Sequence, residues 1–267
     1  VFDNGAGSYI RISGTQHMEA VSSMPDWLAQ MLHNLILTGQ CTDITLELND
    51  SMMTQVLDSG TVSTSSDFVL AGTCTTSFQT SGANRSNNIV VGASRLNNLI
   101  VLPGQTVSVS DTILPRTRAN GYKEAGVYVN GAHTSGLGGG VCQISSTVYN
   151  AVKNAGLTVV QRNPHSMPVS YLPKGLDAAI AAGSKDLKFR NDYTTPVVLY
   201  TDTSNKHLTV NVLVWNQELA GRSFKLWAKQ TGALSADTYF TTYQDGKEVS
   251  TQFVGTSRYN PYREAVS

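Results

Sequence analysis

The spacing of apolar residues along the chain predicts three helices. Apolar residues recur three or four positions apart over 84–98 and over 143–155, so each stretch is expected to form a helix with one buried face. Gly156 directly follows the second stretch, where a glycine commonly ends a helix in the left-handed conformation. A run with similar spacing at 27–36 predicts a further helix near the N-terminus.

Alternating and β-branched residues predict more strands than helices. Two of these strands flank the turn residues Ser204-Asn205-Lys206, and Asp245-Gly246 marks another hairpin. We therefore expect an α+β fold, a β-rich domain of mixed or antiparallel strands with a few helices. The predicted strands span residues 42–48, 68–78, 105–110, 195–203 and 207–215.

Changes in the pattern divide the chain into three parts. Residues 1–67 look like a separate or partial module that closes with the hydroxyl-rich linker SGTVSTSS at 59–66. Residues 68–215 are expected to form the main domain. Residues 216–267 are expected to form a β extension that packs on it.

Composition narrows the classes of protein that this chain can belong to. It has 267 residues, of which only 14% are charged, against about 25% in an average soluble domain. The 19 basic residues balance the 19 acidic ones, and 27 Ser and 28 Thr supply the polarity that charge does not. Because binding to nucleic acid needs a basic surface, no nucleic-acid partner is expected. A hydroxyl-rich, charge-poor surface suits an exported protein.

Membrane and leader segments are not evident in the sequence. No run reaches the roughly 18 apolar residues that a membrane-spanning helix needs. The chain opens VFDNGAGSYI, without the basic and apolar regions of a leader, so we expect any signal or anchor to lie outside it.

Three cysteines are present, and only one has surroundings that suggest chemistry. Cys41 and Cys74 lie beside strand-like segments, where a structural disulfide between them is one possibility. Cys142 follows three consecutive glycines and begins a predicted helix. No cysteine or histidine pair has the spacing of a zinc site, so we expect neither a metal nor another cofactor.

Cys142 is placed where a nucleophile would be. The partial positive charge at a helix N-terminus lowers the pKa of a thiol. The glycines before Cys142, including Gly139 and Gly140, permit a close approach of substrate and offer amide groups to an oxyanion.

A cysteine nucleophile also needs a base, which is usually distant in sequence. Among the five histidines, His165 is the first choice, because prolines restrict the chain on both sides of it in RNPHSMP. His133, in a glycine-rich loop, is the second choice. Asp177 and Asp186 could each orient the imidazole, and of the two we assign Asp186.

Each of these features also has an ordinary structural explanation. A cysteine after glycines often serves only as a small apolar residue in a tight strand-to-helix turn. The glycine triplet is reminiscent of a phosphate loop, but no Lys-Ser/Thr follows it and GxGxxG is absent, so no nucleotide is expected. Arg116 is either a surface charge or a partner for a substrate carboxylate, and Glu124 is either an ion-pair partner or a group that recognises an amine.

Several blocks of sequence, in order and at plausible spacing, resemble the VanW domain of Gram-positive bacteria. The resemblance runs from about Phe68 to Trp215, and the segment before it is similar to the end of a peptidoglycan-binding-like module. Asn163 stands where many relatives have His, and SVSDTILPRT is a loose version of the family's block. The matching blocks are PRTRANGYKEAGVYVNG, GLGGGVCQISSTVYNAVKNAGL and RNPHSMPVSYLPKGLDAAIAAGSKDLKFRN.

The resemblance implies an L,D-transpeptidase whose nucleophile is the cysteine of GGGVCQ. That cysteine is Cys142 here, and the histidine of the PHS motif is His165. We therefore expect Cys142 to form a thioester with a peptidoglycan stem peptide and to make 3-3 cross-links, with L,D-carboxypeptidase activity when water takes the acyl group. A non-catalytic module that binds peptidoglycan or a glycopeptide, and a cysteine endopeptidase of the cell wall, are the alternatives.

The resemblance also implies where the protein works and what it touches. We expect an extracellular location, in the cell wall or on the outer face of the cytoplasmic membrane of a Gram-positive bacterium. Its partners are then peptidoglycan stem peptides, and it contacts the membrane only through a segment outside this chain. The catalytic residues are predicted to be Cys142, His165 and Asp186. Substrate binding is assigned to Arg116, which would hold the terminal D-Ala carboxylate, and to Tyr122, Glu124, Gly139, Gly140 and Ser145.

Overall fold

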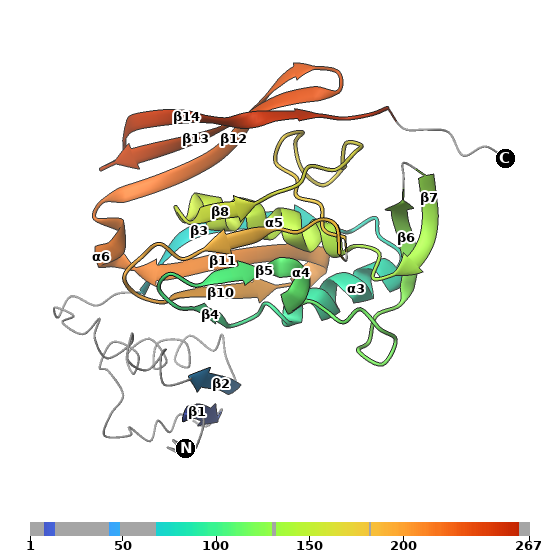
Figure 1. Cartoon of the computed structure of the whole chain (residues 1–267), viewed down its shortest axis with the longest axis horizontal. Coiled ribbons are helices and arrows are strands. Elements are labelled where there is room, and N and C mark those ends of the chain that lie inside the picture. Colours follow the sequence, from blue (N-terminus) through green and yellow to red (C-terminus); the bar gives the residue numbers. More distant parts are fainter. Residues whose placement is uncertain (1–7, 14–42, 49–67, 130–131, 182, 262–267) are drawn as a thin grey trace. The chain divides into compact units, whose positions relative to one another are not determined.

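Strands are more numerous than helices in the computed structural model of the chain, and most strand pairs are antiparallel (Figure 1). The α+β class expected from the sequence is therefore confirmed. The helix expected at 27–36 and the linker expected at 59–66 lie outside the described residues. The structure describes residues 8–13, 43–48, 68–129, 132–181 and 183–261.

The chain divides into two compact units. One contains residues 1–69 and 215–218, and the other contains residues 70–214 and 219–267. In the first unit, β1 (Ser8–Ser13) pairs antiparallel with β2 (Asp43–Leu48), which confirms the strand expected at 42–48. The assignment of three parts along the sequence stays a prediction.

A four-stranded sheet in the order β3-β11-β10-β4 carries much of the core. Strand β11 alternates as its sequence HLTVNVLVW predicts: Leu208, Val210 and Val212 are fully buried, and the residues between them are partly exposed. In the turn before β11, η1 (Ser204–Lys206), Asn205 and Lys206 adopt the left-handed conformation, with φ of 54° and 56°. The strands of this sheet are β3 (Phe68–Ser77), β4 (Leu99–Val101), β10 (Val197–Asp202) and β11 (His207–Trp215).

The first predicted helix of the main domain is shorter than its apolar spacing suggests. Helix α3 spans Ala83–Ser94, whereas the sequence predicts a helix to residue 98. Leu96 is fully buried in the turn that follows, and Leu99 begins β4. The chain reverses at Asn98, whose φ of 58° is a left-handed conformation that asparagine tolerates. The apolar residues after α3 are thus buried by a turn and a strand.

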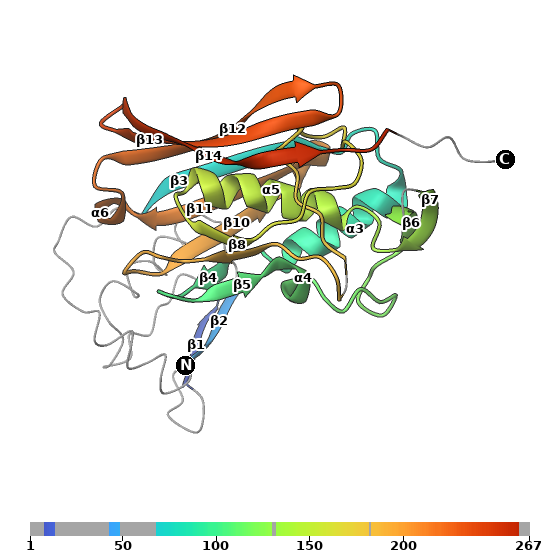
Figure 2. The ribbon, with the colours of Figure 1, turned by 45° about the horizontal axis from the view of Figure 1, so that its top comes forward.

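Helix α5 (Val141–Asn154) lies in the middle of the second unit (Figure 2). It contacts α3, β8 and β12, and nearly all of its residues are buried. Gly156, with φ of 82°, follows its C-cap as predicted. On one side the helix meets the four-stranded sheet so closely that a Cβ on Gly72 of β3 would lie 2.3 Å from Ala151 O and Ala155 N.

Two smaller sheets lie beside α5 and α3, through β8 and β6 respectively. In one of them the expected strand at 105–110 is shorter, because Ser108 accepts a hydrogen bond from Asp111 N at 3.0 Å and so begins helix α4 (Val109–Thr112). The sequence did not predict the other, a hairpin of β6 and β7, in which AHTSGL has few β-branched residues. The strands are β5 (Thr106–Ser108), β8 (Thr158–Gln161) and β9 (Lys188–Arg190) in the first sheet, and β6 (Glu124–Val129) and β7 (Ala132–Leu137) in the second.

A three-stranded antiparallel sheet follows the short helix α6 (Asn216–Leu219) and packs on α5. Lys153 at the end of α5 places its Nζ 3.6 Å from the centre of the Phe240 ring. Asp245 and Gly246 have φ of 50° and 78°, the values of the predicted hairpin turn. The strands are β12 (Arg222–Gly232), β13 (Ser235–Gln244) and β14 (Lys247–Arg258).

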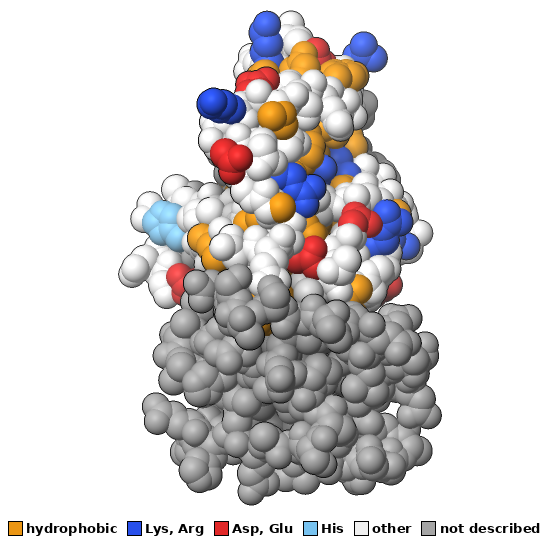
Figure 3. All heavy atoms as spheres, turned by 90° about the vertical axis from the view of Figure 1, so that its left-hand side faces the viewer, with side chains coloured by type: hydrophobic (Ala, Val, Ile, Leu, Met, Phe, Trp, Pro, Cys, Tyr) orange, Lys and Arg blue, Asp and Glu red, His pale blue; other side chains and the backbone are white. Residues whose placement is uncertain are grey.

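The described part of the surface in Figure 3 carries charges of both signs, interspersed with apolar and neutral side chains. This mixture agrees with the equal numbers of basic and acidic residues in the sequence. Within the described residues, no helix is both long enough and apolar enough to span a membrane.

The close approach of β3 to α5 predicts a large effect of a small substitution. Gly72→Ala would place a methyl group against helix backbone, so we expect a loss of about 1–3 kcal/mol in the free energy of unfolding, measured by urea denaturation. Gly82→Ala is the control for added bulk, because nothing lies within 4 Å of its added Cβ; as the N-cap of α3 it should lose less, about 0.5 kcal/mol. Equal stability of the two variants would contradict the packing described.

Candidate active site

Cys142 is the second residue of α5, directly after a turn that only glycines can form. Gly138 and Gly140 have φ of 82° and 112°, and a Cβ on Gly139 would lie 2.5 Å from Gly126 O. Gly140 is the N-cap of the helix. The glycine triplet therefore brings β7 into α5 sharply and leaves the half-buried Cys142 at the helix start.

His165 lies in the loop after β8, held to a single carboxylate oxygen. Its Nδ1 is 2.6 Å from Asp177 Oδ2, and its backbone N–H donates to the same oxygen at 2.7 Å. Because Nδ1 is engaged by Asp177, Nε2 is the ring nitrogen that can serve the thiol.

Asp177 is fully buried, and three different side chains and one amide support its charge. Tyr259, just beyond β14, donates from its hydroxyl to Oδ1 at 2.6 Å, and Arg162 Nη2 lies 3.2 Å from the same oxygen. Burial alone would raise the pKa of this carboxyl, but the hydrogen bonds from His165 and Tyr259 and the charge of Arg162 lower it below its ordinary value. Asp177 is therefore an anion at neutral pH.

Asp186, assigned from the sequence as the orienting residue, lies elsewhere. Its Oδ2 accepts from Ser108 Oγ at 2.6 Å and its Oδ1 accepts from Ser110 N at 3.0 Å, so it holds the start of α4. Asp177 is beside the imidazole because the segments around the two residues run together, with Ala179 N donating to Asn163 O at 2.7 Å. The catalytic assignment is corrected from Asp186 to Asp177 on this geometry.

Cys142 and His165 form an electrostatic pair. Burial alone would raise the pKa of the Cys142 thiol, but a hydrogen bond with His165, the charge of that imidazole and the charge of Arg116 lower it. Burial would likewise lower the pKa of His165, but its hydrogen bonds with Asp177 and Cys142 raise it to about 9. Both shifts favour the charged forms, a thiolate beside an imidazolium, which is the reactive state of a cysteine nucleophile.

Cys74 provides the contrast within the same chain. It also carries a free thiol, in β3, and burial raises its pKa to about 12. Burial raises this pKa without an opposing charge, so Cys74 stays a neutral, inert thiol. Cys41 lies outside the described residues.

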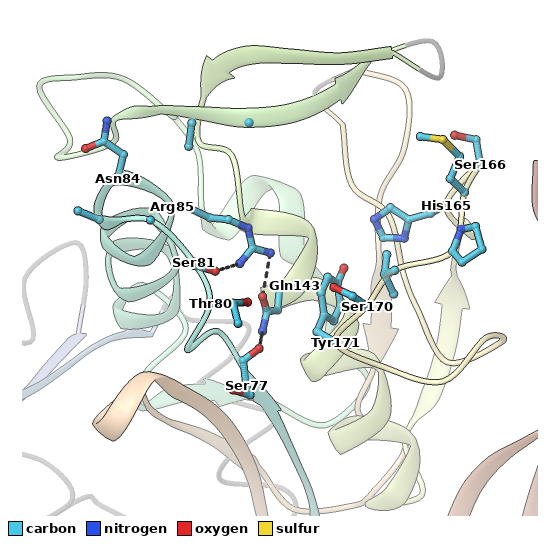
Figure 4. A pocket seen from close by; sticks show the side chains of 17 residues that line it. Ser77, Thr80, Ser81, Asn84, Arg85, Gln143, His165, Ser166, Ser170 and Tyr171 are labelled. Carbon is cyan, nitrogen blue, oxygen red and sulfur yellow. Dashed lines mark hydrogen bonds between the residues drawn. The ribbon is translucent and has the colours of Figure 1, made fainter. Parts of the chain in front are cut away.

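Two cavities meet at the cysteine–histidine pair. The smaller, about 350 Å³, is lined by Cys142, Arg116 and the glycine turn. The larger, about 650 Å³, is lined by His165, the first turn of α3 and the loop at 166–171 (Figure 4). Arg85, Gln143, His165 and Tyr171 line both. The reactive pair therefore faces binding space on two sides.

The structure brings together only some of the residues assigned to substrate binding. Arg116, Gly139 and Gly140 line the smaller cavity with Cys142. The other three assigned residues line neither cavity. The exposed Glu124 pairs with Arg118, the buried Tyr122 donates to Ile113 O, and the buried Ser145 donates to Ala178 O.

Ser145 and its neighbour have a positioning role instead. Ser145 and Ser146 both donate to Ala178 O, and the amide of Ala178 donates back to Ser146 Oγ at 2.9 Å. These bonds fasten the segment that carries Asp177 to helix α5. His133, the second choice of base, lies in β7, paired in register with Tyr128.

Sequence reasoning missed Arg85, Arg162 and Tyr259. Arg85 lies in a sequence, NRS, that matches a glycosylation sequon by chance and gave no other signal. Arg162 and Tyr259 reach Asp177 through tertiary contacts that no local pattern reveals. Among the described residues, no group of three or more His, Cys, Asp or Glu is arranged to hold a metal ion.

Comparisons with known proteins match this part of the chain. A family model described as "VanW like protein" matches residues 84–213. "Uncharacterized protein YoaR" of Bacillus subtilis (strain 168) is 42% identical over 128 residues, which are 48% of this chain and 42% of that protein. "Vancomycin B-type resistance protein VanW" of Enterococcus faecalis (strain ATCC 700802 / V583) is 35% identical over 114 residues, which are 41% of this chain and 42% of that protein.

The chain thus spans about two fifths of the length of each of these relatives. No solved structure matches it.

The thiolate–imidazolium pair predicts that Cys142 reacts at unusually low pH. Labelling by iodoacetamide, followed by peptide mass spectrometry across pH, is expected to show a midpoint below the ordinary thiol value of about 8.5. His165→Gln removes the hydrogen bond and the charge that oppose the effect of burial on the Cys142 pKa, so the pH midpoint of labelling should rise. Labelling at pH 7 slows about tenfold or more, since the thiolate fraction falls about tenfold for each pH unit below the pKa.

His207→Gln, at an exposed histidine bonded to Asn205 O, is the control for this experiment and should label like the unaltered protein. A midpoint that is the same with and without the His165 imidazole would refute the pair.

Tyr259 is predicted to act on the thiol through Asp177 and His165. Tyr259→Phe removes a donor from a buried carboxylate, which should cost about 1–3 kcal/mol of stability. The weakened anion holds the imidazolium less well, so the labelling midpoint of Cys142 should rise. Tyr193→Phe loses a comparable hydroxyl bond, 2.7 Å to Ala155 O, away from the site. It should lose stability and keep the midpoint, and an unchanged midpoint in Tyr259→Phe would count against the linkage.

Proposed function

We propose that this chain, whose residues 84–213 belong to the VanW-like family and are homologous to VanW and YoaR, is a cysteine L,D-transpeptidase of peptidoglycan. The observation that carries the proposal is the Cys142–His165–Asp177 array between two cavities. The name of one relative, a vancomycin B-type resistance protein, supports a role at the cell wall. We accordingly place the protein outside the cytoplasmic membrane of a Gram-positive bacterium, with peptidoglycan stem peptides as its partners.

The first half-reaction uses the charged pair as it stands. The Cys142 thiolate attacks the carbonyl carbon of the third stem residue, a diamino acid, and forms the C–S bond. The oxyanion is held by amide groups at the start of α5, near Gly140 and Cys142. When the C–N bond to the terminal D-Ala breaks, the leaving amine takes the proton of His165. The products are a thioester, a neutral imidazole and free D-Ala.

The second half-reaction follows from the change in charge at Cys142. The thiolate is one cause of the raised pKa of His165, and it no longer exists in the thioester. The pKa of His165 is therefore lower in the thioester, and the neutral imidazole is free to accept a proton from the next amine. That amine, the side chain of another stem, attacks the thioester and gives its proton to His165. The C–S bond breaks, and the starting pair is restored with a 3-3 cross-link made.

Asp177 keeps the imidazole in place through both steps. It holds Nδ1 and the backbone amide of His165, so the ring cannot turn its other nitrogen away from the cysteine. Water in place of the second amine would give L,D-carboxypeptidase activity from the same thioester.

The proposal is tested by intact-mass measurement after incubation with a tetrapeptide muropeptide. The protein should gain the mass of the muropeptide minus D-Ala, because a thioester forms at Cys142. Cys142→Ala should gain nothing, while Cys74→Ala, which removes an inert thiol, should gain the same mass. Addition of a second stem should discharge the adduct into a cross-linked dimer. An adduct in Cys142→Ala, or none in active protein, would overturn the proposal.

Product analysis separates the alternatives. Cleaved cross-links without new ones would indicate an endopeptidase. An unmodified, unreactive Cys142 with tight peptide binding would indicate a binding module.

A further inference from the structure

The charged side chains that line the larger cavity are basic, and its other lining groups are neutral. Its walls carry hydroxyl and amide groups, from Ser77, Thr80 and Asn84 among others, and apolar groups from the loop after His165. Arg85 and His165 are the basic residues of its lining, and none of the described residues that line it is Asp or Glu. A cavity of this kind favours a ligand with a negative charge.

Two neutral acceptors orient the guanidinium of Arg85. Its Nη1 donates to Ser81 Oγ, and its Nη2 donates to Gln143 Oε1 at 2.8 Å (Figure 4). Gln143 is itself fixed, since its Nε2 donates to Thr76 Oγ1 and to Ser77 O, each at 3.0 Å. These acceptors orient the guanidinium, and a pre-oriented guanidinium is suited to bind a carboxylate.

The chemistry of the proposed reaction decides which part of a substrate enters this cavity. The leaving amine takes a proton from His165 and the incoming amine returns one, so both amines must come within hydrogen-bond reach of the imidazole. His165 lines both cavities, whereas Cys142, Arg116 and the oxyanion-binding turn line only the smaller one. The acyl part of the substrate is therefore placed in the smaller cavity with Cys142, and the leaving amino acid, past the imidazole, in the larger one.

Figure 4 shows Arg85 and His165 on opposite walls of the larger cavity. An amino acid whose amine faces His165 would extend its carboxylate toward Arg85. We infer that Arg85, rather than Arg116, binds the carboxylate at the C-terminus of the stem peptide, and that the larger cavity is the subsite for the leaving amino acid. This inference rests on the proposed function and names the residue that selects a peptide acid over a peptide amide.

The experiment measures binding without turnover, in protein that carries Cys142→Ala. Calorimetry compares a tetrapeptide stem that ends in a free carboxylate with the same peptide ending in a carboxamide. We expect the acid to bind about tenfold or more tightly than the amide, and the preference to vanish when Arg85→Gln is added. Arg85→Lys keeps the charge but not the planar pair of donors, so it should retain part of the preference.

Two matched variants test whether the effect belongs to Arg85. Arg116→Gln should weaken both peptides alike, and Arg118→Gln, at an exposed arginine paired with Glu124, should change neither. With Cys142 restored, Arg85→Gln should keep the iodoacetamide labelling midpoint of the unaltered protein, which shows that the site is still assembled. A preference that survives Arg85→Gln, or that disappears in Arg116→Gln, overturns the inference, as does failure of the acid to bind.

Failure of the inference and failure of the proposed function give different results. A thioester adduct in the unaltered protein, with an acid preference independent of Arg85, overturns only the subsite. An acid preference that depends on Arg85, without any adduct in the unaltered protein, overturns the transpeptidase and leaves the carboxylate subsite standing.

Discussion

The candidate active site depends on keeping one buried carboxylate ionised. An ion without partners inside a protein costs several kcal/mol, and Asp177 is completely buried. Its partners come from two distant parts of the chain: Arg162 and His165 from the loop after β8, and Tyr259 from just beyond β14. Each of these segments must be in place before the charge is tolerated, so the sheets around α5 are arranged around this anion as much as around the apolar core.

The charge of Asp177 is transmitted to the thiol in two steps. The carboxylate raises the pKa of His165, and the imidazolium lowers the pKa of Cys142 against the opposing effect of burial. Cys74 shows what happens to a buried thiol without this chain of charges, since its pKa rises to about 12. The difference in pKa between the two thiols is therefore due to the partners of Cys142. The helix start and the glycine turn determine where Cys142 lies.

Local sequence patterns predicted those features of the site that depend on residues close together in the chain. The glycine triplet requires a sharp turn before a helix, so Cys142 at the start of α5 could be predicted, as could the constrained His165. The choice between Asp177 and Asp186 could not, because it depends on which segment runs beside residue 163 in three dimensions. The same limit applies to the helix at 84–98, where the buried Leu96 and the half-buried Leu99 continue the apolar spacing in a turn and a strand.

The C-terminal sheet contributes to the candidate active site although it lies beyond the family match, which ends at residue 213. Tyr259 bonds Asp177, and its hydroxyl also accepts from Gly175 N at 2.6 Å. Ser257 accepts from Arg162 Nη1, and Asn260 N donates to Ser166 O beside His165. The end of the sheet thus holds the loop that carries Arg162 and His165. A related domain that has the cysteine and histidine but lacks this sheet must satisfy its buried aspartate with other donors, because the cost of an unpartnered anion does not change.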